Sequence, residues 1–165
     1  MNVLDAIRSK RAVREFAPAP IPDDLVSAVL DAGRQSQSSK NTQPWEFVLV
    51  TDKATLKALS ETGTYAGHLA GATFAVVLVG TASGNWNSFD LGQAAAYMQL
   101  AAWEMGIGSC IAAIYEPDKV KALLNLPADL SAWVALSFGY PSPTFRPAKM
   151  GGRKPLDVLV HRERW

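Results

Sequence analysis

A long stretch with almost no polar surface constrains the fold more than any other part of the chain. It covers residues 89–108, and its sequence is FDLGQAAAYMQLAAWEMGIG. The one charged residue between positions 91 and 105 is Glu104, so a helix here carries mostly small or apolar side chains on every face, which is typical of a helix surrounded by protein. We expect Asp90 to cap the start of this helix and Gly106 to end it.

What covers this helix is open at the level of the sequence. The 165 residues suit a single domain, 1–165, that buries about two-thirds of the surface of its unfolded chain. A core of that size has difficulty in covering a helix that is apolar on all sides, so a second subunit is one solution. Burial of the helix entirely within its own chain is the alternative.

Charge and cysteine content exclude several classes of function. Lys and Arg number 16 and Asp and Glu 15, and the net charge of +1 provides no field that selects nucleic acid or an acidic membrane. Cys110 is the only cysteine, which excludes a disulfide framework and structural zinc and fits a reducing compartment. The N-terminus, MNVLDAIRSKR, lacks the apolar region of a signal peptide, and no apolar run reaches membrane-spanning length. The sequence predicts a cytoplasmic protein without a nucleic-acid or membrane partner.

Hydrophobic spacing predicts strands that are separated by helices. Besides the stretch at 89–108, helices are expected over residues 3–13, 23–33, 56–59 and 117–124. Strands are expected over residues 45–50, 74–79, 109–114, 133–138 and, in the tail, 156–160. This order of elements predicts an α/β or α+β sandwich in which helices cover both faces of one sheet.

The usual catalytic motifs are absent from the sequence. Gly106 and Gly108 lack the third glycine of a dinucleotide-binding fingerprint, because Ile111 stands in its place, and there is no phosphate-binding P-loop. With two histidines, His68 and His161, one cysteine and no G-x-S-x-G motif, neither a hydrolase triad nor a metal site has enough groups. We interpret His68 as an ordinary surface or helix-end histidine.

A basic cluster near the N-terminus is the first of three candidates for a binding site. It reads RSKRAVREF at residues 8–16 and places Lys10, Arg11 and Arg14 close together. Arginine side chains suit the geometry of a phosphate dianion, so these cations could converge on one. A solvated basic helix end, stabilised by the dipole of its own helix, is the alternative.

The other two candidates are a polar loop and a basic segment near the C-terminus. The loop, SSKNTQPWEF at residues 38–47, collects hydroxyls and amides directly before a buried strand, and an ordinary polar loop is the alternative. The C-terminal segment, GGRKP at residues 151–155, presents Arg153 and Lys154 after two glycines.

These clusters resemble those of the nitroreductase-like flavoenzymes. The family shows a basic R-R-S-x-R-x-F segment, which reads KRAVREF at residues 10–16 here. It also shows a P-S-x-x-N-x-Q-P-W-x-F loop, which reads QSSKNTQPWEF at residues 37–47 and is the most specific match. An alanine-rich helix ending in G-x-G, a G-Y-P turn at 139–141 and a G-R-K-P segment at 152–155 follow in the family's order. The resemblance therefore spans nearly the whole chain.

The resemblance implies a three-layer sandwich with a mixed central sheet, and a homodimer with FMN at the subunit interface. The long apolar helix would lie in that interface, and the tail would reach toward the partner. In one chain the cofactor-binding residues would be the phosphate ligands Lys10, Arg11, Arg14 and Arg153 or Lys154, the backbone of Ala12, and Ile111, Ala112 and Ala113 along the flavin ring. The other chain would contribute Ser38, Ser39 and Asn41. A backbone N–H, that of Ala113, would donate to flavin N5.

The activity that the resemblance implies is hydride transfer from NADH or NADPH through FMN to a nitroaromatic, quinone or similar flat acceptor, by a ping-pong mechanism. No side chain would act as an acid or base, because the flavin carries the chemistry. Two alternatives stay open: a flavin carrier or sensor without efficient turnover, and an oxidative flavoenzyme of the same fold.

The sequence also departs from the family pattern, and one departure is that the long apolar helix lacks the Gln-Asn pair often seen in the family. Ala12 replaces the usual serine, and Gln37 stands where proline is common. Tyr65 and His68 occupy the segment in which larger relatives place an asparagine and a basic residue near the ring. These departures leave the acceptor and the choice between NADH and NADPH open.

Overall fold

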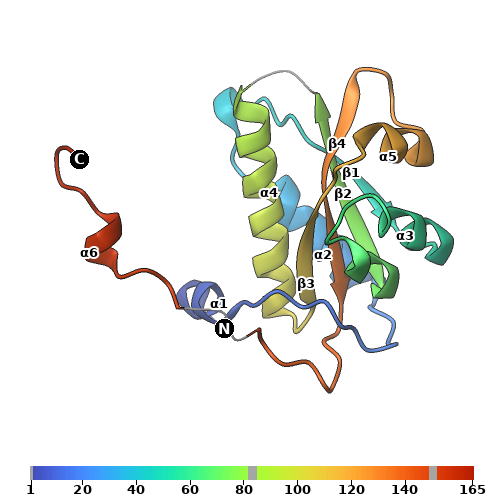
Figure 1. The fold of residues 1–165 in the computed structure, drawn as a ribbon, viewed down its shortest axis with the longest axis horizontal. Helices are drawn as coiled ribbons and strands as arrows, with labels where there is room; N and C mark the ends of the chain where they lie inside the picture. Colours follow the sequence, from blue (N-terminus) through green and yellow to red (C-terminus); the bar gives the residue numbers. More distant parts are fainter. Residues whose placement is uncertain (1, 82–84, 149–151) are drawn as a thin grey trace.

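The computed structural model describes residues 2–81, 85–148 and 152–165, and its centre is a sheet of four strands (Figure 1). These are β1 (Glu46–Val50), β2 (Phe74–Thr81), β3 (Gly108–Ala113) and β4 (Leu130–Gly139), in the spatial order β1-β2-β4-β3. The expectation of a mixed sheet needs correction, because every pair of neighbouring strands is antiparallel. The one parallel pairing that the described residues contain is an isolated bridge between Ala12 and Ser109.

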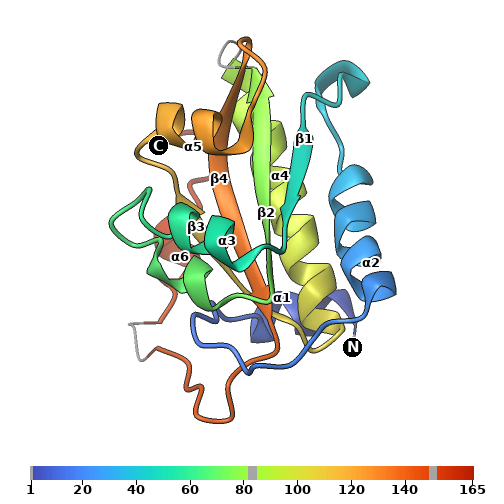
Figure 2. The same cartoon turned by 90° about the vertical axis from the view of Figure 1, so that its right-hand side faces the viewer.

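Helices cover both faces of the sheet, which confirms the predicted three-layer sandwich (Figures 1 and 2). One face carries α2 (Asp23–Arg34) and α4 (Asn85–Glu104); the other carries α3 (Lys53–Leu59), the 3-10 helix η2 (Gly67–Gly71) and α5 (Pro117–Leu124). Side chains of β2 alternate between the two layers, because successive residues of a strand point to opposite faces. Phe74, Val76 and Leu78 pack toward α2 and α4, whereas Ala75, Val77 and Val79 pack toward α3 and α5.

The helix α4 is buried on one side and open on the other. Its inward side is lined mainly by small residues that let it approach the sheet and α2: Leu91, Ala94, Ala95, Met98 and Ala102. Its outward side exposes three aromatic side chains, since Trp86, Phe89 and Tyr97 retain 63%, 57% and 43% of their accessible surface. Within a single chain this apolar helix is therefore only partly covered.

The sequence-based expectation held at the C-terminal end of α4 and failed at its N-terminal end. Gly106 adopts a φ of 75°, a left-handed conformation that glycine reaches at little cost, and the helix ends just before it, as predicted. Asp90 is not the N-cap, because the helix already begins at residue 85. The buried Asp90 carboxylate instead accepts a hydrogen bond of 3.0 Å from the backbone N–H of Ser39. The helix therefore begins five residues before the predicted cap, which is about one and a half turns earlier.

The N-terminal segment runs from a short helix to the edge of the sheet. Helix α1 (Val3–Ser9) is shorter than the predicted 3–13, and Asn2 caps its start through Asp5 N–H. After it the chain becomes extended and lies along β3: Val13 N–H donates to Ser109 O at 3.0 Å, and Phe16 bridges Pro141. Residues 10–13 are therefore part of an extra edge segment and not of a helix.

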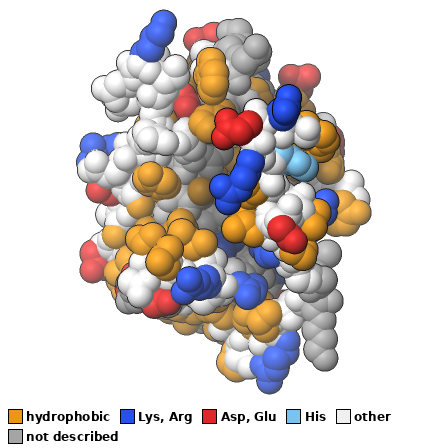
Figure 3. Space-filling model, turned by 90° about the vertical axis from the view of Figure 1, so that its left-hand side faces the viewer, with side chains coloured by type: hydrophobic (Ala, Val, Ile, Leu, Met, Phe, Trp, Pro, Cys, Tyr) orange, Lys and Arg blue, Asp and Glu red, His pale blue; other side chains and the backbone are white. Residues whose placement is uncertain are grey.

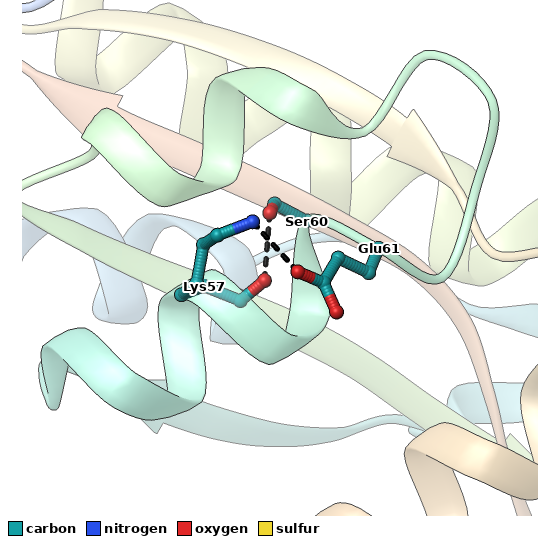
Figure 4. A network of polar contacts seen from close by, with 3 residues as sticks. All are labelled: Lys57, Ser60 and Glu61. Atoms are coloured by element: carbon teal, nitrogen blue, oxygen red, sulfur yellow. Dashed lines mark hydrogen bonds and ion pairs between the residues drawn. The ribbon is translucent and has the colours of Figure 1, made fainter.

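Hydrogen bonds form a turn at the C-terminal end of α3, where the chain leaves the helix toward η2 (Figure 4). Ser60 Oγ donates to the carbonyl of Lys57 at 2.7 Å, and Lys57 Nζ pairs with Glu61 at 2.6 Å. Thr62 Oγ1 donates to Leu59 O at 2.8 Å from a buried position. The exposed ion pair contributes little to the free energy of unfolding by itself. The hydrogen bonds of the turn therefore fix the direction in which the chain continues into η2.

The C-terminal tail forms a short helix in place of the predicted strand 156–160. Helix α6 (Leu156–Leu159) projects away from the body of the molecule, and its residues are exposed (Figure 1). The expectation of a strand was wrong because the tail pairs with no strand among the described residues, and an isolated strand cannot satisfy its backbone. Leu156, Val158 and Trp165 are left exposed to solvent.

We predict that Gly108→Ala destabilises the protein by about 1–3 kcal/mol, the usual range for overpacking. A methyl group at Gly108 would lie 2.7 Å from Val13 Cβ, which belongs to the segment lying along β3. Denaturant unfolding measures the change in the free energy of unfolding. Gly71→Ala is the control, because a methyl group there meets open space. Equal stability of the two variants would show that the segment around Val13 is not held against β3.

Candidate functional site

A basic cleft lies between α1, the segment after it and the beginning of the tail. Its volume is about 610 Å³, and it is lined by Ile7, Arg8, Arg11, Ala12, Arg14, Ala148, Gly152 and Arg153. This volume falls in the range of roughly 300–1,000 Å³ that is usual for cofactor sites. Four of the lining residues are arginines, and none of the described lining residues is acidic. The cleft is therefore suited to an anion with several negative charges.

The arginines are held by the local backbone. The Arg11 guanidinium donates through Nη1 to the carbonyls of Arg8 and Lys10, at 2.8 and 2.9 Å, so it caps the C-terminal end of α1. Arg14 follows the buried Val13 in the extended segment, and the alternation of an extended chain turns its side chain outward. Two different local structures thus present two arginines to one cleft.

The predicted phosphate ligands are brought together in part. Arg11, Arg14 and Arg153 line the cleft together with Ala12. Lys10 and Lys154 are not among its lining residues, and Gly151 lies outside the described residues. Burial lowers the pKa of the Lys10 ammonium; the charge of Arg14 adds to this effect, and nearby Cys110 opposes it. Lys10 thus lies toward Cys110.

Cys110 has the character of a buried structural cysteine. It retains 3% of its accessible surface, and burial raises the pKa of its thiol against the opposing charges of Arg14 and Lys10. A raised pKa disfavours the thiolate, which is the nucleophilic form. The geometry therefore gives this thiol no role as a nucleophile at neutral pH.

The open edge of β3 adjoins the basic segment and carries the second group of predicted residues. The carbonyl of Ser109 accepts from Val13 at this edge, while β4 pairs along the other edge. Residues two apart on an antiparallel strand direct their backbone groups to the same edge, so Ile111 and Ala113 face the same edge as Ser109 does. At Ala113 the backbone carbonyl on this edge lies close to Gly63. Ala112 is directed toward β4 and is buried. Two of the three predicted residues thus offer backbone N–H groups here.

The polar loop lies elsewhere in the chain. Ser38 and Ser39 line a separate pocket of about 280 Å³ together with Gln37, Trp86, Phe89, Asp90 and Gln93. Asn41 follows in the 3-10 helix η1 (Ser39–Asn41) and is exposed. This loop and α1 lie at opposite ends of α4 (Figures 1 and 2). Within one chain, therefore, the structure does not bring Ser38, Ser39 and Asn41 to the basic cleft.

His68 is a buried residue that the sequence-based reasoning misjudged. It retains 8% of its accessible surface, and its Nδ1 lies 2.8 Å from Ser137 Oγ on β4. Burial, with a further contribution from the charge of Arg14, lowers the pKa of the imidazole to about 4, although the nearby Ile111 carbonyl opposes this shift. His68 is therefore neutral at pH 7 and is not a surface histidine. Helix η2 spans five residues, too few for hydrophobic periodicity to show that one side is buried.

The described residues contain neither a cluster of metal ligands nor a helix that could span a membrane. No group of three or more His, Cys, Asp or Glu residues in the described part of the chain could hold a metal ion. Among the same residues, no helix combines the length and the apolar character needed to cross a membrane.

Comparisons with known proteins agree with the fold and the motifs. The model of the nitroreductase family matches residues 7–64 and 60–140. A relative from Archaeoglobus fulgidus, described as a candidate NADH dehydrogenase/NAD(P)H nitroreductase, is 29% identical over 98% of both chains. The NADH dehydrogenase of Thermus thermophilus is 26% identical over 97% of both.

Solved structures share the same architecture. A Bacteroides thetaiotaomicron protein, also described as a candidate NADH dehydrogenase/NAD(P)H nitroreductase, superposes with a TM-score of 0.87 at 28% identity, covering 98% of this chain and 97% of that one. The NADPH:FMN oxidoreductase of Vibrio harveyi, solved with NAD+, superposes with a TM-score of 0.88 at 23% identity. The superposition covers 98% of this chain and 77% of the Vibrio harveyi chain. Because the family model matches well over half of the sequence, this chain belongs to the nitroreductase family.

Proposed function

We propose that this chain is an FMN-dependent NAD(P)H oxidoreductase that reduces a nitroaromatic, quinone or similarly flat acceptor by a ping-pong mechanism. The observation that carries the proposal is the basic cleft beside the open edge of β3. The names of the relatives support it. The Archaeoglobus fulgidus relative is described by both activities, NADH dehydrogenase and NAD(P)H nitroreductase, and a solved neighbour is an NADPH:FMN oxidoreductase. These names refer to those proteins, and we extend them here to this chain.

The residues of the cleft fit FMN. A phosphate dianion suits a cleft lined by Arg8, Arg11, Arg14 and Arg153, because guanidinium groups bind phosphate oxygens through paired N–H donors. The open edge of β3 begins beside Arg14, since Val13 is paired with Ser109. A ligand with an anionic end and a flat polar ring can therefore contact both.

The roles of the chain are binding, orientation and polarisation. When bound, FMN supplies the hydride chemistry between NAD(P)H and the acceptor. The backbone N–H of Ala113, or that of Ile111 two residues before it, would donate to the N5 edge of the ring and would stabilise negative charge there. No ionisable side chain has to act as an acid or base in this scheme.

A second copy of the chain completes the proposed site. The exposed side of α4 carries Trp86, Phe89 and Tyr97, and α1 nearby exposes Val3, Leu4 and Ile7. Figure 3 looks onto this side of the molecule and shows hydrophobic side chains in several groups, with Lys and Arg between them. Covering this face with a partner would hide apolar surface and would allow the loop at Ser38 and Ser39 of one chain to reach the cleft of the other. We therefore propose a homodimer with FMN at its interface.

Steady-state kinetics tests the proposal directly. The purified protein is expected to be yellow and to bleach on anaerobic addition of NADH or NADPH. Because donor and acceptor use the same place in turn, double-reciprocal plots at several quinone concentrations should be parallel. A yellow protein that neither nucleotide bleaches would be a flavin carrier or sensor. Intersecting lines would exclude the ping-pong mechanism.

Arg14→Ala should weaken FMN binding about ten- to hundredfold, since a charged hydrogen bond contributes roughly 1.5–3 kcal/mol. Riboflavin, which has no phosphate, should bind equally well to the variant and the wild type. Titration with fluorescence quenching measures both dissociation constants. Arg34→Ala is the control, because Arg34 is an exposed residue of α2 that pairs with Asp31 away from the cleft. Equal losses for the two flavins would place the phosphate elsewhere.

Ala96→Glu should dissociate the dimer and release flavin. Ala96 is exposed on α4, so the charge does not disturb the fold of one chain, but burying it without a partner costs about 3–5 kcal/mol in an interface. Neighbouring Ala95 is unsuitable, because it is buried within its own chain. Sedimentation with detection of flavin absorbance measures both effects, and Ala54→Glu, on exposed α3, is the control. An Ala96→Glu dimer that keeps its flavin would contradict the proposed interface.

A further inference from the structure

Side-chain hydrogen bonds tie the polar loop before β1 to α4. The carboxyl group of Asp90, a residue that is 2% exposed, accepts from the backbone N–H of Ser39 at 3.0 Å and from Gln93 Nε2 at 3.2 Å. Gln93 Oε1 in turn accepts from Gln37 Nε2 at 2.6 Å. The loop is thus connected at both Gln37 and Ser39 to one turn of α4.

The loop depends on such support because its backbone is strained. Lys40, Asn41 and Gln43 have φ values of 52°, 56° and 48°, in the left-handed region that residues other than glycine rarely enter. Asparagine reaches this region more readily than lysine or glutamine does. A hydrogen bond of 3.0 Å from Gln43 N–H to Ser38 Oγ closes the turn, but it lies within the loop. The bonds to α4 are therefore needed to hold the turn against the body of the protein.

The same hydrogen bonds determine which groups of the loop face a ligand. Asp90 engages the backbone N–H of Ser39, so the side chains of the loop are what is left to donate. Ser38 Oγ accepts from Gln43 N–H, and a hydroxyl group that accepts still has its own proton to donate. For the Ser39 hydroxyl, no hydrogen-bond partner is found in the described part of the chain. Both serines line the pocket of about 280 Å³, so two hydroxyl donors are available there.

We infer that Asp90 is a positioning residue, which holds the hydroxyl groups of Ser38 and Ser39 where they bind the FMN in the cleft of the partner chain. This inference rests on the proposed function, in which the loop of one chain reaches the cleft of the other. Asp90 acts through the loop and not on the flavin, because both of its oxygens are engaged by Ser39 and Gln93. Gln37, which stands where the family commonly has proline, adds a second attachment that a proline side chain could not make.

Two substitutions of Asp90 test this role. Asp90→Ala removes both acceptors, so FMN should bind about three- to tenfold more weakly in a fluorescence-quenching titration. Hydrogen exchange of the Ser39 amide, followed by NMR, should become about tenfold faster. Asp90→Asn is the matched variant, since its oxygen can still accept from Ser39 N–H and its amide can donate to Gln93 once the amides of Gln93 and Gln37 turn over. Asp90→Asn should therefore keep the FMN affinity and the slow exchange.

Met98→Ala is the control for a general loss of stability. Met98 is buried on α4 about two turns after Asp90, and its side chain packs beside Gly33 of α2. This variant should unfold at a lower temperature but keep the FMN affinity and the exchange rate of Ser39. If Asp90→Ala does not fold, Gln93→Ala replaces it, because it removes the attachment of Gln37 from a half-buried position and should change both readouts in the same direction.

The outcomes separate this inference from the proposed function. Unchanged FMN affinity in Asp90→Ala overturns the positioning role, and so does weaker binding without faster exchange of the Ser39 amide. Equal losses in Asp90→Ala and Asp90→Asn also overturn it, since a charge and not the hydrogen bonds would then be responsible. In each of these cases FMN binding by the wild type stands. A wild type that binds no FMN overturns the proposed function itself.

Discussion

The candidate site depends on one short backbone pairing, between the segment after α1 and the edge of β3. The hydrogen bond from Val13 N–H to Ser109 O holds the two segments side by side, and the missing side chain of Gly108 gives Val13 the room to lie there. The same pairing turns Val13 into the core and Arg14 toward solvent. It also leaves the N–H of Ile111 on the edge that continues beyond the pairing. One contact therefore joins the part of the site suited to phosphate with the part suited to a ring.

The helix α4 satisfies two separate packing demands. Its inner residues, such as Ala94 and Met98, fill the core of their own chain, while Trp86 and Tyr97 on its outer side are left exposed. A helix that is apolar on all faces is unusual in a domain of this size. In α4 one apolar face packs in the core of its own chain, and the other apolar face is exposed in the single chain. In the proposed dimer, the outer side is covered by a second copy. In that dimer, the sequence pattern would reflect the assembly as well as the fold.

Local sequence patterns predicted most of the helices and strands. Features that depend on contacts between distant segments of the chain were not predicted correctly. The helix predicted at residues 117–124 from proline in its first turn has the same bounds in the structure. The strand predicted at residues 74–79 extends two residues further, to Thr81. The motifs singled out Arg11 and Arg14, and the structure places both in one cleft, because the two residues are close together in the sequence. Strand direction, the tail and His68 were misjudged, because each depends on which distant segment lies alongside. His68 in particular is defined by Ser137, sixty-nine residues further along the chain.

The capping of α1 by Arg11 has a consequence for how an anion is received. A guanidinium group has five N–H donors, and the carbonyls of Arg8 and Lys10 engage only Nη1. Among the described residues, no partner is found for the donors on Nε and Nη2, and the hydrogen bonds to the end of the helix hold the side chain in place without a ligand. An incoming anion therefore meets a prearranged donor and loses little entropy in ordering it. In the proposed site, the C-terminal end of α1 would thus hold the guanidinium group of Arg11 in position for an anion.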